Sequence, residues 1–346
     1  MSPIEIGIIG SGPWAKNYVN ALLKIPNVRI MGYARRRNLD CPEFQGIKRF
    51  ADALDLIEAR PSGVIIATDP RYHLDLLDFA QDLRVPALVE KPVSCSPVGQ
   101  AHKAVSDFMK KHENSITPVK VGYIHLWSPA YRTLHKYCQN EYITKITSAG
   151  GNAGPYRNWS ALYDYGSHDL AMIVDLLRNP SSIIIEYAAC CQKIRGELYI
   201  AKLNAQENIN HNVEIYVFCG NGFYKKSRSF SVSLRSHETL VYDDVMPIGQ
   251  KLTIPSENDK NAISPNEIIK TEIYNEKLPL DLMVAGFLDV VKASREGIYP
   301  KAICISDMHL AERVTFLLDT IARACHVGQT VFSRPRQAPI AVNATI

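Results

Sequence analysis

The sequence of 346 residues lacks several features that would assign it to large classes of protein. No hydrophobic run approaches the roughly 20 residues that a membrane-spanning helix requires. The formal charge is only +4 and no dense stripe of lysine and arginine occurs, which argues against a nucleic-acid partner. There is no internal repeat and no low-complexity segment. What remains is an ordinary globular composition, with 46% hydrophobic residues, and a length that suits two domains.

The eight cysteines are scattered without a repeated Cys-x-x-Cys spacing, so a zinc site is not indicated. Cys190 and Cys191 are neighbours in a strand-like run, where successive side chains point to opposite faces. We therefore expect buried thiols rather than disulfides or metal ligands, as in a reducing cytosol. Only Met1, Ser2 and Pro3 precede the first apolar run, which leaves no room for a signal peptide. We expect a soluble cytoplasmic protein without a bound metal.

The first third of the chain alternates between apolar strands and helices. Ile4–Ile9 is a continuous apolar strand, and Pro13–Lys24 follows as a helix with proline in its first turn. The alternation continues with strands at 28–34, 64–67, 85–89 and 119–123 and helices at 51–59, 72–83 and 97–112. Strands joined by helical crossovers predict an α/β fold with a parallel, doubly wound sheet that is buried on both faces. We assign residues 1–122 to this first domain.

The pattern changes after Gly122. A helix at 129–140 and a strand at 143–149 lead to a helix at 169–177. Five strands of alternating polarity follow, at 182–190, 197–203, 212–219, 223–234 and 238–242. Such alternation predicts a half-buried antiparallel sheet. The second domain is then 123–346, with a polar surface loop at 255–276, two closing helices within 278–327 and a loosely held tail at 333–346.

A glycine turn follows the first strand. Gly10, Ser11 and Gly12 precede the helix that begins at Pro13, with Trp14 next. Glycines at 10 and 12 allow a tight turn and a close approach of the backbone to a pyrophosphate, toward which the helix aims its N-terminal amides. The motif is also compatible with a simple strand–helix turn, but its place in a βαβ unit favours dinucleotide binding.

The end of the second predicted strand bears on the choice of nucleotide. An acidic residue there would bond the ribose 2′-hydroxyl, whereas this chain has Ala34 followed by Arg35, Arg36 and Arg37. Arginine offers planar, charged donors that suit a 2′-phosphate. We therefore favour NADP(H), with NAD(H) as a possible cofactor. The alternative is a solvated basic turn that touches no cofactor.

Two further motifs carry chemically useful residues. Glu90, Lys91 and Pro92 follow an apolar strand, at the carboxyl edge where parallel sheets bind ligands. Asp164 and His168 are four residues apart, so a helical backbone would place them on one face. Imidazole can take or return a proton near neutral pH, and a nearby carboxylate raises its proton affinity. The alternatives are a surface lysine and a histidine that is bonded to Asp164 for structure alone.

In their order along the chain, these motifs resemble those of the Gfo/Idh/MocA family of glucose–fructose oxidoreductase and inositol dehydrogenase-like enzymes. The matching segments are GIIGSGPW at 7–14, IIATDPRYH at 65–73, VEKP at 89–92 and DYGSHDL at 164–170. The resemblance covers nearly the whole chain. It implies an N-terminal Rossmann domain and a C-terminal α/β domain with a large, open, mostly antiparallel sheet. Because that sheet often forms the oligomer interface in the family, a homo-oligomer, dimer or tetramer, is implied.

The resemblance also implies roles for individual residues. Lys91 would orient the reacting hydroxyl, His168 would act as the acid/base and Asp164 would assist it, while the bond before Pro92 is often cis in the family. The loop after the third predicted strand would run under the cofactor. The cofactor-binding candidates are Gly10, Ser11, Gly12, Pro13, Trp14, Ala34, Arg35, Arg36, Thr68, Pro70, His73, Glu90, Lys91 and Pro92.

Several assignments leave alternatives open. Trp14 is equally compatible with core packing, and His73 with capping of its helix. His125 stands where the family more often has arginine or asparagine, so it either faces the substrate or packs in the interior. The substrate-binding candidates are His125, Tyr156, Arg157, Asn158 and Trp159. The last four form a loop that either binds a polyol or a carboxylate or is an ordinary surface loop.

We therefore expect an NAD(P)-dependent dehydrogenase or reductase that acts on CH–OH groups. It would transfer a hydride between nicotinamide C4 and a hydroxyl or ketone carbon of a sugar, sugar-nucleotide or cyclitol. One alternative is a reductase of the same fold that acts on a non-sugar substrate such as an imine. Another is a non-catalytic NAD(P)-binding sensor or partner protein. The complete set of Lys91, Asp164 and His168 argues against both.

Overall fold

The computed structural model divides into two compact units, and the chain enters each of them more than once. The described residues are 2–34, 42–177, 182–193, 196–208, 211–236, 238–247, 251–254, 278–297, 307–331 and 342–345. The first unit comprises Met1–Ser96, Ala101–Trp127 and Lys277–Glu312. The second comprises Pro97–Gln100, Ser128–Glu276 and Arg313–Ile346.

A parallel sheet forms the centre of the first unit, with the strand order β3-β2-β1-β4-β5-β6. The strands are β1 (Ile4–Ile9), β2 (Val28–Ala34), β3 (Arg49–Phe50), β4 (Gly63–Ile66), β5 (Ala87–Val89) and β6 (Val119–Val121). The residues of β4 and β5 are all buried, as expected for strands covered on both faces. Strand order reverses between β1 and β4, which is the point where open α/β sheets bind ligands.

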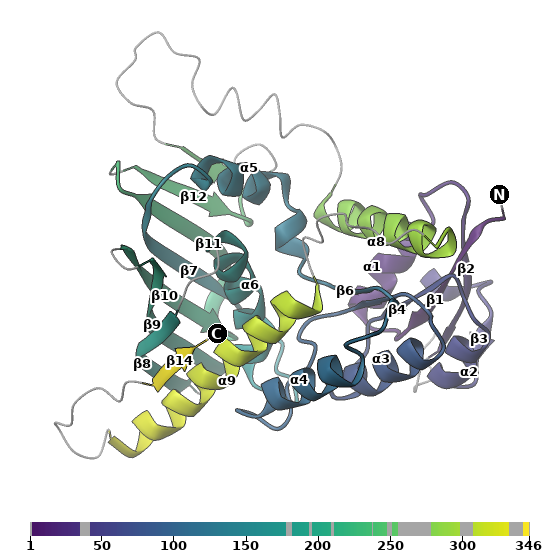
Figure 1. The fold of residues 1–346 in the computed structure, drawn as a ribbon, viewed down its shortest axis with the longest axis horizontal. Coiled ribbons are helices and arrows are strands. Elements are labelled where there is room, and N and C mark those ends of the chain that lie inside the picture. Colours follow the sequence, from purple (N-terminus) through teal and green to yellow (C-terminus); the bar gives the residue numbers. More distant parts are fainter. Residues whose placement is uncertain are drawn as a thin grey trace, which may run out of the picture. The chain divides into compact units, whose positions relative to one another are not determined.

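Helices cover both faces of this sheet. They are α1 (Pro13–Leu22), α2 (Ala53–Glu58), α3 (His73–Asp82), α4 (Ala101–Lys111) and α8 (Pro279–Arg295), with short turns η1 (Pro42–Phe44), η2 (Pro70–Tyr72) and η3 (Ile124–Trp127). Figure 1 shows α1 and α8 on one side of the sheet and α2, α3 and α4 on the other. The parallel, doubly wound α/β prediction is therefore confirmed.

Helix α8 belongs to the first unit, although it lies more than 150 residues beyond the predicted boundary at 122. Its residues Phe287 and Val291 pack closely against Gly63 at the start of β4. Phe287 is also part of the hydrophobic core that α1 shares with β1. The predicted boundary at 122 places this helix in the second domain, because periodicity reveals an apolar face but not what the face covers.

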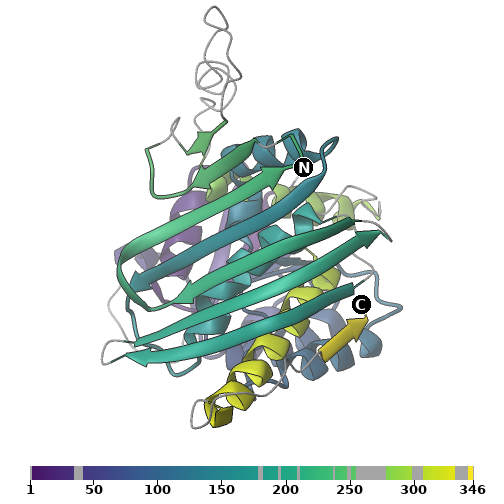
Figure 2. The same cartoon turned by 90° about the vertical axis from the view of Figure 1, so that its left-hand side faces the viewer.

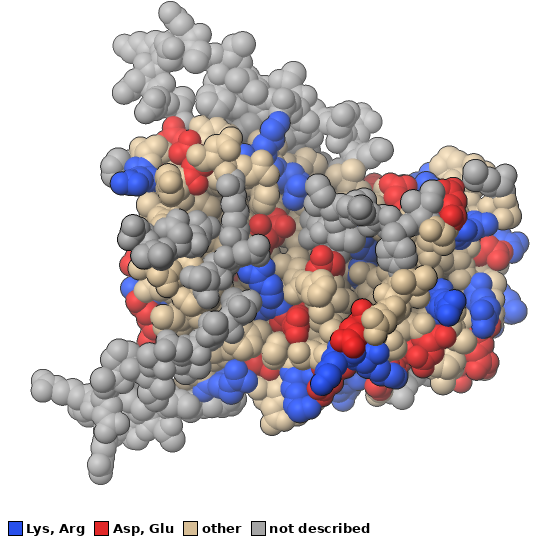
Figure 3. All heavy atoms as spheres, viewed as in Figure 1, with Lys and Arg blue, Asp and Glu red and all other residues tan. Residues whose placement is uncertain are grey.

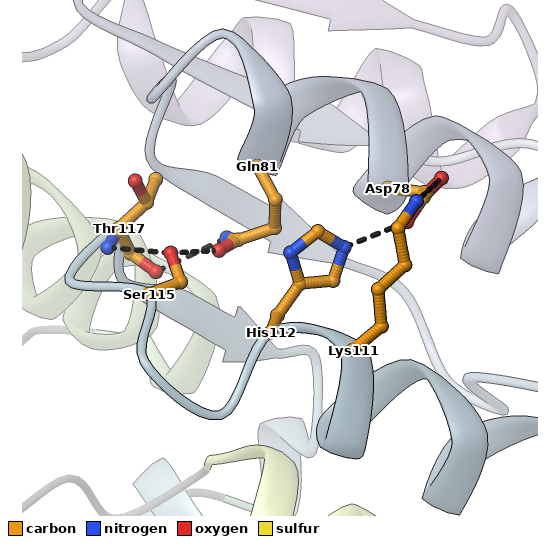
Figure 4. A network of polar contacts seen from close by, with 6 residues as sticks. All are labelled: Asp78, Gln81, Lys111, His112, Ser115 and Thr117. Carbon is orange, nitrogen blue, oxygen red and sulfur yellow. Dashed lines mark hydrogen bonds and ion pairs between the residues drawn. The ribbon is translucent and has the colours of Figure 1, made fainter.

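Helices α3 and α4 are joined by a network of polar side chains, drawn in Figure 4. The carboxylate of Asp78 accepts hydrogen bonds from Lys111 Nζ at 2.6 Å and from the His112 ring at 2.6 Å. Although partial burial acts to raise the pKa of Asp78, the hydrogen bonds from Lys111 and His112 lower it below its usual value. Ser115 donates to the side chain of Gln81 at 2.6 Å and extends the network.

The second unit is built on a sheet with the strand order β13-β12-β11-β7-β10-β9-β8-β14. The strands are β7 (Ile143–Ala153), β8 (Ser182–Lys193), β9 (Gly196–Asn208), β10 (His211–Gly220), β11 (Gly222–Leu234), β12 (Thr239–Asp243), β13 (Leu252–Thr253) and β14 (Val342–Thr345). Only the β7–β10 pair among these described strands is parallel. The mostly antiparallel sheet is as predicted.

The alternating strands bury one face of this sheet. In β10, Val213, Ile215 and Val217 are buried, whereas Glu214 between them is exposed. Figures 1 and 2 show α5 (Pro129–Cys138) and α6 (Ser167–Leu176) on the same side of the sheet, and α9 (Met308–Val331) continues into this unit. The face that the family resemblance implies as an oligomer interface is the opposite one, and that role stays a prediction.

Some predicted boundaries shift. The helix expected at 97–112 begins only at Ala101, because Gly99 has a φ of +79°, which a helix cannot contain. The tail expected to be loosely held contributes β14, which pairs with β8. The polar loop predicted at 255–276 lies outside the described residues. Cys95, Cys138, Cys219 and Cys325 are buried free thiols as expected, whereas Cys191 is exposed, since it points away from the covered face of β8.

Charges of both signs are intermixed on the face of the molecule shown in Figure 3. On α4, for example, the ammonium of Lys103 lies 2.5 Å from the carboxylate of Asp107. A search of the described helices finds none with the length and hydrophobicity needed to cross a membrane.

Candidate active site

The glycine turn connects β1 to α1 at the switch point of the first sheet. Gly10 has a φ of +125°, and a Cβ there would overlap the carbonyl oxygen of Ala67 at the end of β4. Gly12 is exposed and open space surrounds it, so the first turn of α1 is accessible. Helix α1 has neither a capping side chain nor an acidic residue in this turn. The N-terminal amides of α1 therefore fit a pyrophosphate group.

Replacing Gly10 by alanine should destabilise the protein, because the side chain would meet both the left-handed backbone and the Ala67 carbonyl. We expect the free energy of unfolding to fall by about 1–3 kcal/mol, measured by urea denaturation. Gly12→Ala is the matched control, since its φ is −74° and its Cβ would meet no atom within 4 Å. That variant should keep its stability and weaken only dinucleotide binding. Equal stability of the two variants would contradict this account.

Of the segment predicted to select the nucleotide, the structure describes Ala34. It is buried at the end of β2, and its carbonyl accepts a hydrogen bond of 2.9 Å from the amide of Gly10. The end of β2 is thereby tied to the glycine turn. Arg35, Arg36 and Arg37, on which the preference for NADP(H) depends, lie outside the described residues.

The turn that carries Lys91 follows β5 and is held by buried side chains. Glu90 is 6% exposed, and its carboxylate accepts a hydrogen bond of 2.5 Å from Tyr18 Oη in α1 and one of 3.2 Å from the amide of Lys91. Burial, followed by the charge of Glu90, raises the pKa of Tyr18 well above its usual value, so the phenol keeps its proton. The Lys91–Pro92 bond is cis, as the resemblance implied. Lys91 itself is half-buried.

His73 links this turn to the loop after β4. Its ring is fully buried, with Nδ1 at 2.9 Å from the carbonyl of Pro92 and Nε2 at 3.2 Å from the carbonyl of Thr68. Carbonyl oxygens only accept hydrogen bonds, so a neutral ring can satisfy one of them and a protonated ring both. Burial is the largest influence and lowers the pKa of His73 to about 4, against the two hydrogen bonds and Asp69, which raise it. At neutral pH the ring is therefore uncharged.

This depressed pKa predicts a pH dependence of stability. Between pH 6.5 and about 4, the unfolded chain binds a proton at His73 that the folded chain does not, so stability falls as the pH falls. The loss from this group alone is about 3 kcal/mol across that window. His73→Gln should flatten the stability curve there, as measured by urea denaturation at several pH values. Parallel stability curves for the wild type and His73→Gln would contradict the assignment.

The acid/base motif lies in the second unit, where η4 (Leu162–Gly166) leads into α6. The wider π-helical turn of η4 contains Asp164, and His168 lies in the first turn of α6. Both residues are buried, with exposed fractions of 8% and 7%. Gly166 lies between them because a Cβ there would come within 3.0 Å of Cys219 Sγ in β10. Turns of this kind are frequent at functional sites.

The carboxylate of Asp164 accepts a hydrogen bond of 2.8 Å from Arg157 Nε. The predicted substrate loop therefore contacts the predicted acid/base motif. Tyr156 and Asn158 in this loop are exposed, and Trp159 is half-buried beside the Arg157 guanidinium, 5.1 Å from its ring centre. Asp164 as the helper of His168 stays a prediction.

A buried ion pair supports the start of α6. Asp169 is fully buried, and its carboxylate accepts hydrogen bonds of 2.5 Å from Arg228 in β11 and of 2.6 Å from Ser148 in β7. The glycine at 150 leaves room for this pair, since a Cβ there would overlap the Arg228 guanidinium. Neither Asp169 nor Arg228 is among the site residues predicted from the sequence.

The predicted site residues thus fall into two groups. The first unit holds the glycine turn, Ala34, the Thr68 loop, His73 and the Glu90–Pro92 turn, all at the carboxyl edge of one sheet. It also holds Trp14 and His125, both half-buried, the latter within η3. The second unit holds Asp164, His168 and the loop 156–159.

Comparison with known proteins bears on both units. Residues 4–118 match the family model GFO_IDH_MocA, described as an oxidoreductase family with an NAD-binding Rossmann fold. No curated protein matches the chain. Among solved structures, a protein assigned as an oxidoreductase from Magnetospirillum magnetotacticum is 26% identical, with a TM-score of 0.72, over 94% of this chain and 100% of that one.

Two other structures share the fold at lower identity. Scyllo-inositol dehydrogenase from Lactobacillus casei, with NAD(H) and scyllo-inositol bound, is 13% identical with a TM-score of 0.66, covering 94% of this chain and 98% of its own. Biliverdin reductase from Synechocystis, in complex with biliverdin and NADP+, is 15% identical with a TM-score of 0.69. The match covers 94% of this chain and 99% of that one. Proteins of this fold thus include one bound to NAD(H) and one bound to NADP+.

Proposed function

We propose that this chain, whose residues 4–118 match the Gfo/Idh/MocA oxidoreductase family, transfers a hydride between nicotinamide C4 and a hydroxyl or ketone carbon of a sugar, sugar-nucleotide or cyclitol. NADP(H) is the favoured cofactor. The nicotinamide supplies or accepts the hydride, and the protein contributes binding, orientation and proton transfer.

The observation that carries the proposal is the rigid turn of Lys91 at the carboxyl edge of the sheet. Tyr18 is hydrogen-bonded to Glu90, which precedes this lysine. His73 is hydrogen-bonded to the carbonyl of Pro92, which follows it. Lys91 is half-buried on this turn at the ligand edge, and an ammonium there can donate a hydrogen bond to a substrate hydroxyl and favour its ionised form. We assign that role to Lys91.

His168 is proposed to exchange the hydroxyl proton with the substrate, and Asp164 to assist it. During oxidation the hydroxyl loses its proton to the imidazole as the hydride leaves the same carbon; during reduction the imidazole returns it. A histidine in the first turn of a helix, with a carboxylate one turn earlier, suits this role.

The cofactor assignment is tested by fluorescence titration of the purified protein with NADPH and, separately, with NADH. We expect tighter binding of NADPH and a loss of that preference in the variant with serine at Arg35 and Arg36. Tighter binding of NADH would overturn the role of the arginines while leaving the oxidoreductase standing. Binding of neither nucleotide would overturn the proposed function.

A second assay follows nicotinamide absorbance in the presence of sugars, sugar-nucleotides and cyclitols. Turnover with a member of this panel would support the proposal. Turnover only with non-sugar carbonyl or imine compounds would favour the alternative reductase, a possibility kept in view because biliverdin reductase shares the fold. Binding of a nucleotide without turnover of any compound would favour a non-catalytic NAD(P)-binding protein.

A further inference from the structure

The loop before the acid/base motif is held rigidly at both ends. At one end, the amide of Gly154 donates to the carbonyl of Asn221 at 3.1 Å, and Tyr165 Oη donates to the Gly154 carbonyl at 2.8 Å. At the other end, the amide of Ala161 donates to the Glu197 carboxylate at 2.8 Å. The groups that hold the loop belong to η4, to the start of β9 and to the turn after β10. The loop residues between Gly154 and Ala161 are therefore held in place by hydrogen bonds at both ends.

Arg157 extends from this loop, and most of its donors meet no acceptor among the described residues. A guanidinium has five N–H donors, and Arg157 gives the one on Nε to Asp164. Within the described part of the chain, its two terminal nitrogens have no acceptor, and 38% of the side chain is exposed. Trp159 lies under the guanidinium and restrains its plane through a cation–π contact. The Nε1–H of Trp159 is itself buried and meets no acceptor among the described residues.

A guanidinium that is oriented through Nε offers its remaining edge as a planar fork. Such a fork matches the two oxygens of a carboxylate or phosphate, and these charge-assisted pairs are stronger than hydrogen bonds to a neutral hydroxyl. Asp164 offsets part of the positive charge, so recognition depends on the geometry of the fork more than on long-range attraction. The position of Arg157 beside Asp164 brings the fork next to the residues assigned to proton transfer.

We propose that Arg157 binds an oxyanion of the substrate, so that the preferred substrates are acidic sugars or cyclitols that carry a carboxylate or a phosphate. This inference rests on the proposed function and narrows its substrate class. Asp164 then has a second task as the residue that positions Arg157.

The test compares neutral and acidic partners of the same ring. Binding of glucose, glucuronate, glucose 6-phosphate, myo-inositol and myo-inositol 1-phosphate to the full-length protein is measured by calorimetry, without turnover. We expect at least one acidic member to bind about 10- to 100-fold more tightly than its neutral partner, as charged hydrogen bonds imply. Preference for glucuronate alone would identify a carboxylate site, and preference for the phosphates alone would identify a phosphate site.

The decisive variant is Arg157→Lys, which keeps the charge and removes the planar fork. It should abolish most of the acidic preference. Arg132→Lys is the matched control, because Arg132 is 39% exposed and its guanidinium is 3.9 Å from the Asp175 carboxylate in the same unit. The proposal is overturned if no acidic compound binds better than its neutral partner or if Arg157→Lys keeps the preference. Nucleotide titration of the same samples reports separately on the proposed function, and thermal unfolding on their folding.

Discussion

Replacing His168 by alanine is expected to lower kcat by about 10²- to 10⁴-fold, the usual contribution of a positioned acid or base. The substrate hydroxyl would then have to exchange its proton with water, which is a poorer partner at neutral pH. The affinity for NADPH, measured by fluorescence titration, should change little, because the dinucleotide contacts are assigned to the glycine turn and its neighbours in the first unit. The loss should therefore appear in kcat rather than in cofactor binding.

A second variant separates proton transfer from packing at this buried position. His168→Asn keeps a polar side chain of smaller size but cannot exchange a proton near neutral pH, so it should be as inactive as the alanine variant. The control is His102→Asn in α4, which should keep the wild-type kcat. His102 is partly exposed, and its Nε2 lies 3.8 Å from the Glu312 carboxylate. Wild-type kcat in either His168 variant would refute the assignment of His168 as acid/base.

The alternation of the strands carried most of the fold prediction. Continuous apolar runs predicted the parallel strands β1, β4 and β5, and alternating runs predicted the long strands β9 to β11 of the mostly antiparallel sheet. The pattern could not predict which elements pack together, and α8 packs on β4 from more than 200 residues further along the chain. It also could not predict two-residue strands such as β3, which are too short to show a period. Tertiary packing, not local preference, decides both.

At the candidate site, the sequence pointed to chemically distinctive residues but not to the hydrogen bonds that hold them in place. Glu90 and His73 were expected at the cofactor, whereas the structure buries both side chains and turns them to Tyr18 and to the backbone around Lys91. Their cofactor role stays a prediction, but their positioning role is visible in the hydrogen bonds. Tyr18 lies in the apolar stripe of α1, where nothing in the sequence distinguishes it from a core residue.

Arg228 could have been found from the sequence. It shares the inward face of β11 with Phe230, Val232 and Leu234, since residues two apart point to the same side of a strand. An arginine at such a position must be paired if it is to be buried. Its partner Asp169 directly follows His168, and this places a buried charge pair beneath the start of the helix that carries the proposed acid/base.

The largest expected effect on stability comes from breaking that pair. Arg228→Met should lower the free energy of unfolding by about 3–5 kcal/mol, because it leaves the Asp169 carboxylate buried without its cationic partner. Of the two hydrogen bonds to Asp169 described above, the one from the Ser148 hydroxyl would remain. A single neutral hydroxyl stabilises a buried carboxylate less than a charged guanidinium does. The measurement is urea denaturation at pH 7 of the wild type and the variant.

The double variant Asp169→Asn with Arg228→Met distinguishes loss of a charge partner from loss of packing. Removing both charges leaves an amide that can still accept the hydrogen bond from Ser148, so most of the stability should return. Breaking the exposed pair of Lys103 and Asp107 by Lys103→Met should have little measurable effect, because solvent already screens those charges. If the double variant is as unstable as Arg228→Met alone, the arginine contributes through its volume, and the carboxylate of Asp169 is not what makes its loss costly.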